Sequence, residues 1–300
     1  MTPRRATLAG VSLGDGLPVA VLGVLNVSPE SFHAGSVRVT DDDLLQTALA
    51  MAEAGAALID VGARSTAPYL DAEITETEEQ DRLGRAVELL ATKLAVPISA
   101  DTTRPAPARA ALEAGATVIN DVGGLRDPRV AALVREHGAG VILTATPRSR
   151  PGSGRPPNPE PDPVATVREL LGEALVRARE AGIPEDRIVL DPGIGFFRDE
   201  AIPWDEWDVR VLAGLEALGA LGRPLCVGVS RKSFVGAITG RPRTEARLAG
   251  SLAATAVAVL NGAALLRTHD VAETLDAIRI AERIRRATMT RAMDSEGADR

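Results

Sequence analysis

The sequence predicts a single (β/α)₈ TIM barrel of the α/β class, preceded by a short N-terminal extension at residues 1–18. Eight short runs rich in valine, isoleucine and leucine recur along the chain, each followed by a segment with helical character. The repeat of roughly 30 residues is that of a βα unit, and eight such units close a barrel. No G-x-G-x-x-G turn follows the first run, although a doubly wound open sheet usually carries one there.

The barrel domain is expected to span residues 19–290. Its strands are predicted at the apolar runs Ala20 to Leu25, Leu58 to Val61, Ile98 to Ala100, Val118 to Asn120, Val141 to Thr144, Ile188 to Leu190, Leu225 to Val227 and Leu265 to Thr268. Its helices are predicted near Asp41 to Ala54, Thr75 to Leu94, Pro105 to Ala114, Pro128 to His137, Pro163 to Ala181, Asp205 to Leu218, Glu245 to Leu260 and Val271 to Ala287. Residues 1–18 are expected to form a hairpin at the barrel floor, and residues 291–300 a flexible polar tail.

Composition narrows the partners to small solutes. The chain has 300 residues, 45% of them hydrophobic, which is enough for one large core. A net charge of -7 without a basic and aromatic cluster argues against nucleic acid and anionic membranes as partners. The single cysteine, Cys226, lies in an apolar run and cannot form an internal disulfide. Because no stretch is long enough to span a bilayer either, we expect a cytoplasmic protein.

Polar residues stand where the predicted strands end, and in a barrel of this type those ends build the functional face. The polar groups there are Asn26, Arg64-Ser65-Thr66, Asp101-Thr102, Asn120-Asp121, Asp191, Ser230-Arg231-Lys232 and Arg267-Thr268-His269-Asp270. Each alone could cap a helix or close a turn. Together their desolvation would cost far more than caps require, which indicates a site. Asp60 lies within its strand and is interpreted as structural.

Two kinds of chemistry are indicated on this face. Asp101, Asn120, Asp191 and Lys232 suit the edge of a flat heterocycle with several N–H groups and ring acceptors. The other kind is anionic: Arg267 and His269 meet the start of the last helix, a habitual place for phosphate, and Asn26 faces them with a neutral oxygen that could help to hold Mg²⁺. A heterocycle beside a phosphate site favours group transfer in which an activated carbon loses pyrophosphate.

Six ordered blocks of the chain resemble dihydropteroate synthase, a family of pterin-binding barrels. They are Gly23-Val24-Leu25-Asn26-Val27-Ser28-Pro29-Glu30-Ser31-Phe32, Ile98-Ser99-Ala100-Asp101-Thr102, Ile119-Asn120-Asp121, Leu190-Asp191-Pro192-Gly193-Ile194-Gly195-Phe196, Ser230-Arg231-Lys232-Ser233-Phe234 and Arg267-Thr268-His269-Asp270-Val271. The resemblance implies a synthase that joins 6-hydroxymethyl-7,8-dihydropterin diphosphate to 4-aminobenzoate in folate biosynthesis, releasing pyrophosphate.

The resemblance also implies roles for individual residues. Asp101, Asn120, Asp191 and Lys232 match positions that hold the pterin, and Asn26, Arg267 and His269 match the phosphate and Mg²⁺ positions. The residues expected to act in catalysis are Asn26, Lys232, Arg267 and His269, with Asn26 as the metal ligand. Thr66, Phe32 and Ser233 match further substrate-binding positions, the last two beside the arylamine.

The chain departs from the family pattern in the loops that cover the arylamine. Ala34 stands where the family has an acid, Arg64 replaces another acid, and Ala67 replaces an arginine. The fifth loop lacks the usual Met-His pair, and its proline-rich insertion at residues 147–163 is expected to be a mobile surface loop.

These departures leave three interpretations open: an ordinary dihydropteroate synthase, a sister synthase that takes another arylamine, as in methanopterin pathways, with Arg64 or Arg148 meeting an extra anion, and a pterin-binding paralogue of low activity. A pterin-dependent methyltransferase of the same superfamily is disfavoured, because methyl transfer needs no phosphate site. The apolar helix from Ala246 to Leu260 could form a homodimer interface.

Overall fold

The computed structural model describes residues 3–27, 41–64, 74–147, 162–198 and 200–298, with side chains up to residue 288. Eight parallel strands form a closed barrel in which the last strand pairs with the first. In chain order they are β3 (Ala20–Asn26), β4 (Leu58–Gly62), β5 (Ile98–Asp101), β6 (Val118–Asp121), β7 (Gly140–Thr144), β8 (Ile188–Asp191), β9 (Leu225–Val227) and β10 (Ala263–Thr268). The predicted (β/α)₈ barrel and all eight of its strands are confirmed.

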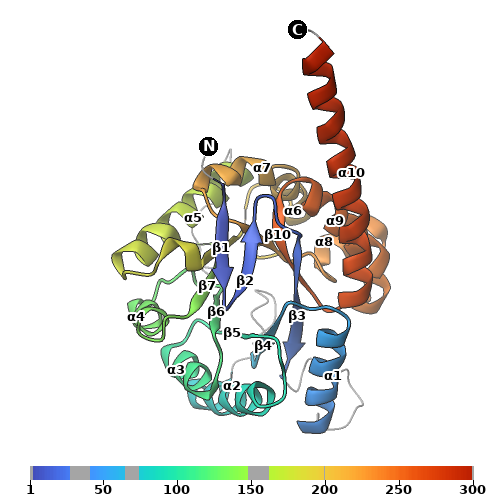
Figure 1. The fold of residues 1–300 in the computed structure, drawn as a ribbon. Coiled ribbons are helices and arrows are strands. Elements are labelled where there is room, and N and C mark those ends of the chain that lie inside the picture. The colour runs from blue at the N-terminus through green and yellow to red at the C-terminus, as the bar shows by residue number, and fades with distance from the viewer. Residues whose placement is uncertain (1–2, 28–40, 65–73, 148–161, 199, 299–300) are drawn as a thin grey trace.

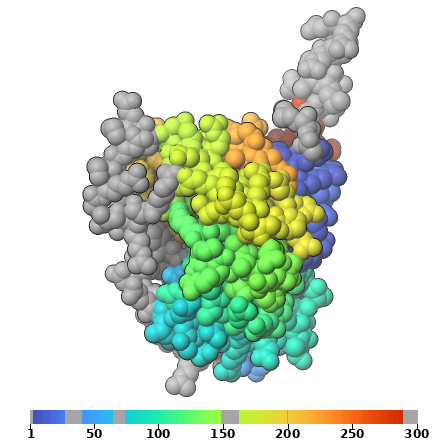
Figure 2. Space-filling model, turned by 90° about the vertical axis from the view of Figure 1, so that its left-hand side faces the viewer, coloured from blue at the N-terminus to red at the C-terminus, as the bar shows by residue number. Residues whose placement is uncertain are grey.

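Helices follow the barrel strands and surround them, so that consecutive units lie side by side around the wall (Figure 1; Figure 2, cyan through green to yellow). They are α1 (Asp41–Glu53), α2 (Glu76–Ala91), α3 (Pro105–Ala114), α4 (Pro128–Glu136), α5 (Pro163–Glu180), α6 (Trp204–Ala213), α7 (Leu215–Leu218), α8 (Ser233–Thr239), α9 (Leu248–Leu260) and α10 (Val271–Ala298). Asp127 and Asp162 cap α4 and α5 through their carboxylates, and a proline occupies the first turn of each.

The helical segments differ from the prediction in three places. The helix expected from Asp205 to Leu218 divides at Gly214 into α6 and α7. The helix expected from Glu245 begins at Leu248. A short helix, α8, precedes it and was missed, because its sequence contains a glycine and three β-branched residues that weaken the helical signal.

The last helix is longer than predicted. It was expected to end near Ala287, but α10 continues to Ala298 and extends beyond the barrel wall (Figure 1). Arg291, Ala292 and Met293 are good helix formers, which favours this continuation. The flexibility expected of residues 291–300 stays a prediction. Within the described residues, no helix has the length and apolar character that a membrane span requires.

The N-terminal extension forms the hairpin that was predicted at the barrel floor. Strands β1 (Arg5–Leu8) and β2 (Val11–Gly14) pair antiparallel. Ala6, Leu8 and Leu13 are buried against side chains from the lower part of the barrel, namely Leu22, Leu58, Val118, Ile142, Val189, Cys226 and Leu265. The hairpin therefore closes one end of the barrel with hydrocarbon. Polar residues inside the barrel lie toward the other end.

Candidate active site

The pairing of the strands brings the predicted polar residues to one level of the barrel. Asn26 is in register with Gly62, Gly62 with Asp101, and Asp101 with Asn120. Gly62 leaves room between its neighbours, since a Cβ atom there would lie 3.6 Å from Asn26 Oδ1 and 3.6 Å from Asp101 Cβ. Because parallel strands all end on the same side, Asn26, Asp101, Asn120 and Asp191 share the carboxyl-terminal end of the barrel.

Arg267 joins this level from β10. Its Nε donates to Asp60 Oδ2 at 2.7 Å, and its Nη2 donates to Asp101 Oδ2 at 2.8 Å. Asn120 Nδ2 donates to the same Asp60 oxygen at 3.0 Å. The guanidinium of Arg267 therefore binds two buried carboxylates, those of Asp60 and Asp101. A residue expected to bind phosphate is thus in direct contact with one expected to bind the heterocycle.

Asp60, which the sequence analysis interpreted as structural, holds residues of the site in place. Its side chain is fully buried and binds two site residues, Arg267 and Asn120. The signal that could have found it is a carboxylate inside an apolar strand, since a buried charge needs a partner. Its direction toward the barrel interior follows only from the register of β4.

Burial raises the pKa of Asp101 to about 7, with the positive charge of Arg267 opposing the rise and the negative charge of Asp60 adding to it. Among the described residues, Asp101 Oδ1 and Asp60 Oδ1 are buried and have no hydrogen-bond partner. Such groups are costly unless a ligand satisfies them. Asp101 Oδ1 is therefore available to accept a hydrogen bond from an N–H group of a bound heterocycle.

Lys232 and Asp191 stand on the neighbouring side of the barrel. Asp191 Oδ1 accepts the backbone N–H of Gly193 at 2.8 Å, and burial raises the pKa of this carboxyl while Lys232 opposes the rise. Desolvation, followed by repulsion from Arg267, lowers the pKa of Lys232. Its Nζ lies 5.2 Å from the centre of the Phe196 ring, so a cation and an aromatic face are presented together.

Gly195 makes room for Lys232. Its φ angle is +89°, and a Cβ atom there would lie 3.2 Å from Lys232 Cδ. Its N–H donates to the buried carboxylate of Asp208 on α6 at 2.8 Å. Asp208, which lies on a helix outside the barrel, thus holds the turn after β8 against Lys232. Asp208 was not singled out from the sequence, where it appears as one of several acids on a helix.

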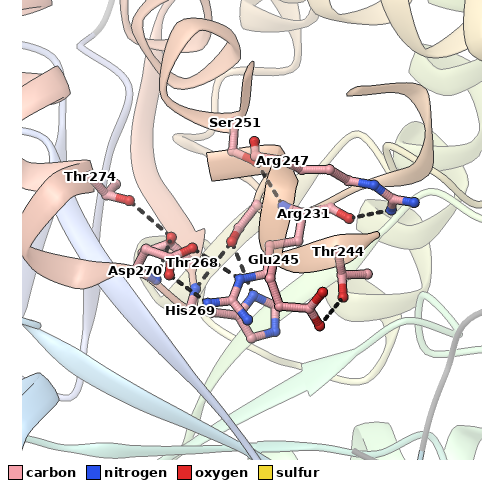
Figure 3. Close-up of polar contacts among 10 residues, drawn as sticks. Arg231, Thr244, Glu245, Arg247, Ser251, Thr268, His269, Asp270 and Thr274 are labelled. Atoms are coloured by element: carbon pink, nitrogen blue, oxygen red, sulfur yellow. Dashed lines mark hydrogen bonds and ion pairs between the residues drawn. The ribbon is translucent and has the colours of Figure 1, made fainter. Parts of the chain in front are cut away.

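The segments after β9 and β10 are joined by two polar contacts (Figure 3). Ser230 Oγ lies 3.0 Å from His269 Nδ1, and Arg231 donates to Asp270 at 2.6 and 3.1 Å. Burial, followed by the positive charges of Arg267 and Arg231, lowers the pKa of His269 to about 4. An imidazole that burial and nearby positive charges hold neutral marks a place where an anion would be favourable.

The arylamine side is described only in part. Ser233 Oγ accepts from Arg198 Nη2 at 3.1 Å. Phe32 and Thr66, with Ala34 and Ala67, lie outside the described residues. Arg64 Nε lies 3.3 Å from the buried carboxylate of Glu79, which also binds Thr102 and Arg104. Glu79 is thus shared by two arginines, Arg64 and Arg104, and its single negative charge does not balance both.

Asp121, at the end of β6, serves a turn. Its carboxylate accepts the backbone N–H groups of Gly123 and Leu125 at 2.6 and 2.9 Å. It lines a cavity of about 310 Å³ at the rim, together with Arg64, Thr103, Arg126 and Thr146. Two larger cavities, of about 810 and 1050 Å³, border the floor hairpin and lie away from the site carboxylates.

The side chains at the functional end of the barrel offer few ligands for Mg²⁺. Among the described residues, no group of three or more His, Cys, Asp or Glu side chains could hold a metal ion. Asn26 instead presents a neutral amide oxygen beside Gly62 and Asp101. A single neutral ligand fits a Mg²⁺ ion whose other ligands are water and substrate phosphates, which is how Mg²⁺ is commonly bound.

Comparison with known proteins gave consistent matches. A model of the pterin-binding enzyme family matches residues 22–269. Dihydropteroate synthase of Escherichia coli is 36% identical over 262 residues, which cover 87% of this chain and 90% of that protein. A probable bifunctional folylpolyglutamate synthase/dihydropteroate synthase of Haloferax volcanii is 38% identical over 262 residues, 87% of this chain and 30% of that longer protein. The structure of Xanthomonas albilineans dihydropteroate synthase with 4-aminobenzoic acid superposes with a TM-score of 0.82 at 38% identity, covering 94% of this chain and 98% of that one.

Proposed function

Because the chain belongs to the dihydropteroate synthase family of pterin-binding enzymes, we propose that it condenses 6-hydroxymethyl-7,8-dihydropterin diphosphate with 4-aminobenzoate. The products are 7,8-dihydropteroate and pyrophosphate, and the pathway is folate biosynthesis. The observation that carries the proposal is the cluster of Asp60, Asp101, Asn120 and Arg267, which leaves a buried acceptor open at the functional end of the barrel.

The pterin would complete this cluster. Its N–H groups would donate to Asp101 Oδ1 and to Asp191, and Lys232 would donate to a ring acceptor. The carboxylates would then exchange an unsatisfied oxygen for a hydrogen bond, which favours binding. Asp60 makes the arrangement rigid, because it fixes both the amide of Asn120 and the guanidinium of Arg267.

The reaction would begin with heterolysis of the bond between the pterin methylene carbon and the diphosphate oxygen. The electron pair leaves with the diphosphate, and the pterin ring stabilises the carbon cation. Arg267 and Lys232 face the negative charge that develops on the leaving group, and His269 adds hydrogen bonding. The arylamine nitrogen then forms the C–N bond and loses a proton, so no general base is needed for the first step.

We propose Asn26 as the protein ligand of Mg²⁺. The ion would supply charge neutralisation to the diphosphate when bound. The amide oxygen of Asn26 would hold the ion beside Gly62, at the level of Asp101.

The sister-synthase interpretation stays open, because Arg64 and Arg104 share the single carboxylate of Glu79 and, among the described residues, leave one positive charge unbalanced. Arg148 lies outside the described residues. A homodimer through α9 stays a prediction, supported by Val257 and Leu260, which are 42% and 37% exposed. The cytoplasmic location also stays a prediction.

The test is pyrophosphate release by the purified protein with the pterin diphosphate, Mg²⁺ and a panel of arylamines. We expect release with 4-aminobenzoate. Release only with other arylamines would support the sister synthase, and no release with any amine despite pterin binding would support the paralogue.

The pterin site is tested separately by calorimetry. We expect Lys232→Ala and Asp191→Ala to abolish binding of the pterin diphosphate. Lys93→Ala is the matched control, because Lys93 is the one other lysine of the chain and is exposed. Unchanged affinity in the Lys232 and Asp191 variants would refute the assignment.

A further inference from the structure

Arg231 adopts a backbone conformation that a side chain with a Cβ atom rarely takes. Its φ angle is +58°, in the left-handed region. It directly precedes Lys232, which occupies the N-cap position of α8, and directly follows Ser230, which contacts His269. A strained residue therefore lies between Lys232 and a residue that contacts His269. Such strain persists only where the surrounding structure holds it in place.

The two groups that hold the Arg231 backbone come from α9 and the residue before it (Figure 3). The Arg231 N–H donates to Ser251 Oγ at 2.9 Å, and Arg247 Nη1 donates to the Arg231 carbonyl oxygen at 2.9 Å. Ser251 in turn donates to the Arg247 carbonyl oxygen at 2.9 Å. Both backbone polar groups of Arg231 are thus bound by one connected pair of side chains.

Ser251 is an unusual residue for its position. It is 3% exposed on α9, a helix composed mainly of alanine, leucine and valine. An alanine there would suit helix formation better than serine. The hydroxyl accepts from the Arg231 N–H and donates to the carbonyl oxygen of Arg247, the residue before the helix. The Ser251 hydroxyl therefore serves the contact with Arg231 more than the packing of the helix.

The side chain of Arg231 carries the constraint onward to β10. It pairs with Asp270, and Asp270 follows His269, which contacts Ser230. The ends of β9 and β10 are therefore bound to each other at two points and to α9 at a third. Lys232 and His269 therefore lie on segments that these contacts hold together.

We propose that Ser251 and Arg247 are positioning residues of the synthase: they hold Arg231 in its left-handed conformation, so that Lys232 and His269 are set for the pterin diphosphate before it binds. This inference rests on the proposed function for its choice of ligand. Because the loop is already ordered, binding of the substrate does not have to order it, and this preorganisation increases the affinity.

The first experiment needs no substrate. Ser251→Ala leaves the Arg231 N–H without its acceptor, so we expect amide hydrogen exchange in the peptide covering residues 228–234 to become faster by about tenfold or more. Thr255→Ala is the matched control, because Thr255 is another buried hydroxyl residue of α9 and makes no hydrogen bond to this segment among the described residues. Its exchange at residues 228–234 should equal that of the wild type.

The second experiment measures the affinity for the pterin diphosphate by calorimetry in a double-mutant cycle. We expect Ser251→Ala to weaken binding about tenfold, because binding must then restore the left-handed conformation of Arg231. In an Arg231→Gly background the same change should cost much less, because glycine adopts the left-handed conformation without support.

The outcomes distinguish a failure of the positioning role from a failure of the proposed function. Equal losses in both backgrounds, or unchanged exchange and affinity in Ser251→Ala, would overturn the positioning role. If the wild type binds no pterin diphosphate, the proposed function fails, whereas the exchange experiment still decides whether Ser251 holds the segment.

Discussion

Replacement of Arg267 by methionine should destabilise the protein by an amount that grows with pH. Methionine keeps an unbranched side chain in the barrel but removes the charge that contacts Asp60 and Asp101 at 2.7 and 2.8 Å. Both carboxylates are buried, and loss of one partner of a buried ion pair typically costs about 3–5 kcal/mol. We expect a loss of this size near neutral pH.

The pH dependence follows from the carboxyl groups. A carboxyl whose pKa is raised by folding destabilises the fold when ionised, so its penalty begins above the unfolded pKa and stops growing above the folded pKa. In the wild type the pKa of Asp101 is raised to about 7, so this penalty is complete above that pH. Without Arg267 the pKa rises further. The variant should therefore continue to lose about 1.4 kcal/mol per pH unit relative to the wild type above about pH 7.

Urea denaturation of both proteins between about pH 7 and pH 8.5 measures this difference. Arg279→Met is the control, because Arg279 pairs with Asp276 at the surface, where a salt bridge contributes at most about 1 kcal/mol. Adding Asp60→Asn to Arg267→Met should reduce the pH dependence, since the negative charge of Asp60 contributes to the raised pKa of Asp101. A difference between variant and wild type that stays constant with pH would refute the reasoning.

Three further predictions concern the surroundings of the site. NMR titration of His269 should give a midpoint near its lowered pKa of about 4, and bound pterin diphosphate should raise that midpoint because an anion favours the imidazolium. Burial raises the pKa of Asp208 to about 6, so Asp208→Asn, which keeps an acceptor for Gly195, should be more stable than the wild type at pH 7 but not near pH 4, as urea denaturation would show; equal gains at both would contradict this. Gly193→Ala should lower the melting temperature, because its Cβ atom would lie 1.8 Å from a backbone oxygen, whereas Gly172→Ala, with open space inside α5, should raise stability by about 0.5–1 kcal/mol.

The strand ends could be read from the sequence because the signals there are local. A run of branched apolar residues ends at a polar one, and parallel strands place all such ends on one side. Asp101, Asn120 and Asp191 were found in this way, and the structure places each within the last two residues of its strand.

The roles of Asp60 and Asp208 could not be predicted from the sequence, because they depend on tertiary contacts. Asp60 meets Arg267 only because β10 pairs with β3 and closes the barrel, which brings together residues 207 positions apart. Asp208 meets Gly195 through the packing of α6 against the turn after β8. Neither contact leaves a pattern in the neighbouring sequence.

The sequence by itself determined the barrel, its floor hairpin and the set of polar residues at its functional end, because apolar periodicity and the common direction of the strands decide these. Only the tertiary structure decided how those residues bind one another. Closure of the barrel made Arg267 the partner of two carboxylates, and α9 stabilised the left-handed Arg231 beside Lys232. The reason is physical: side-chain partners and the pKa values they set depend on register and burial, which arise only when distant segments pack together.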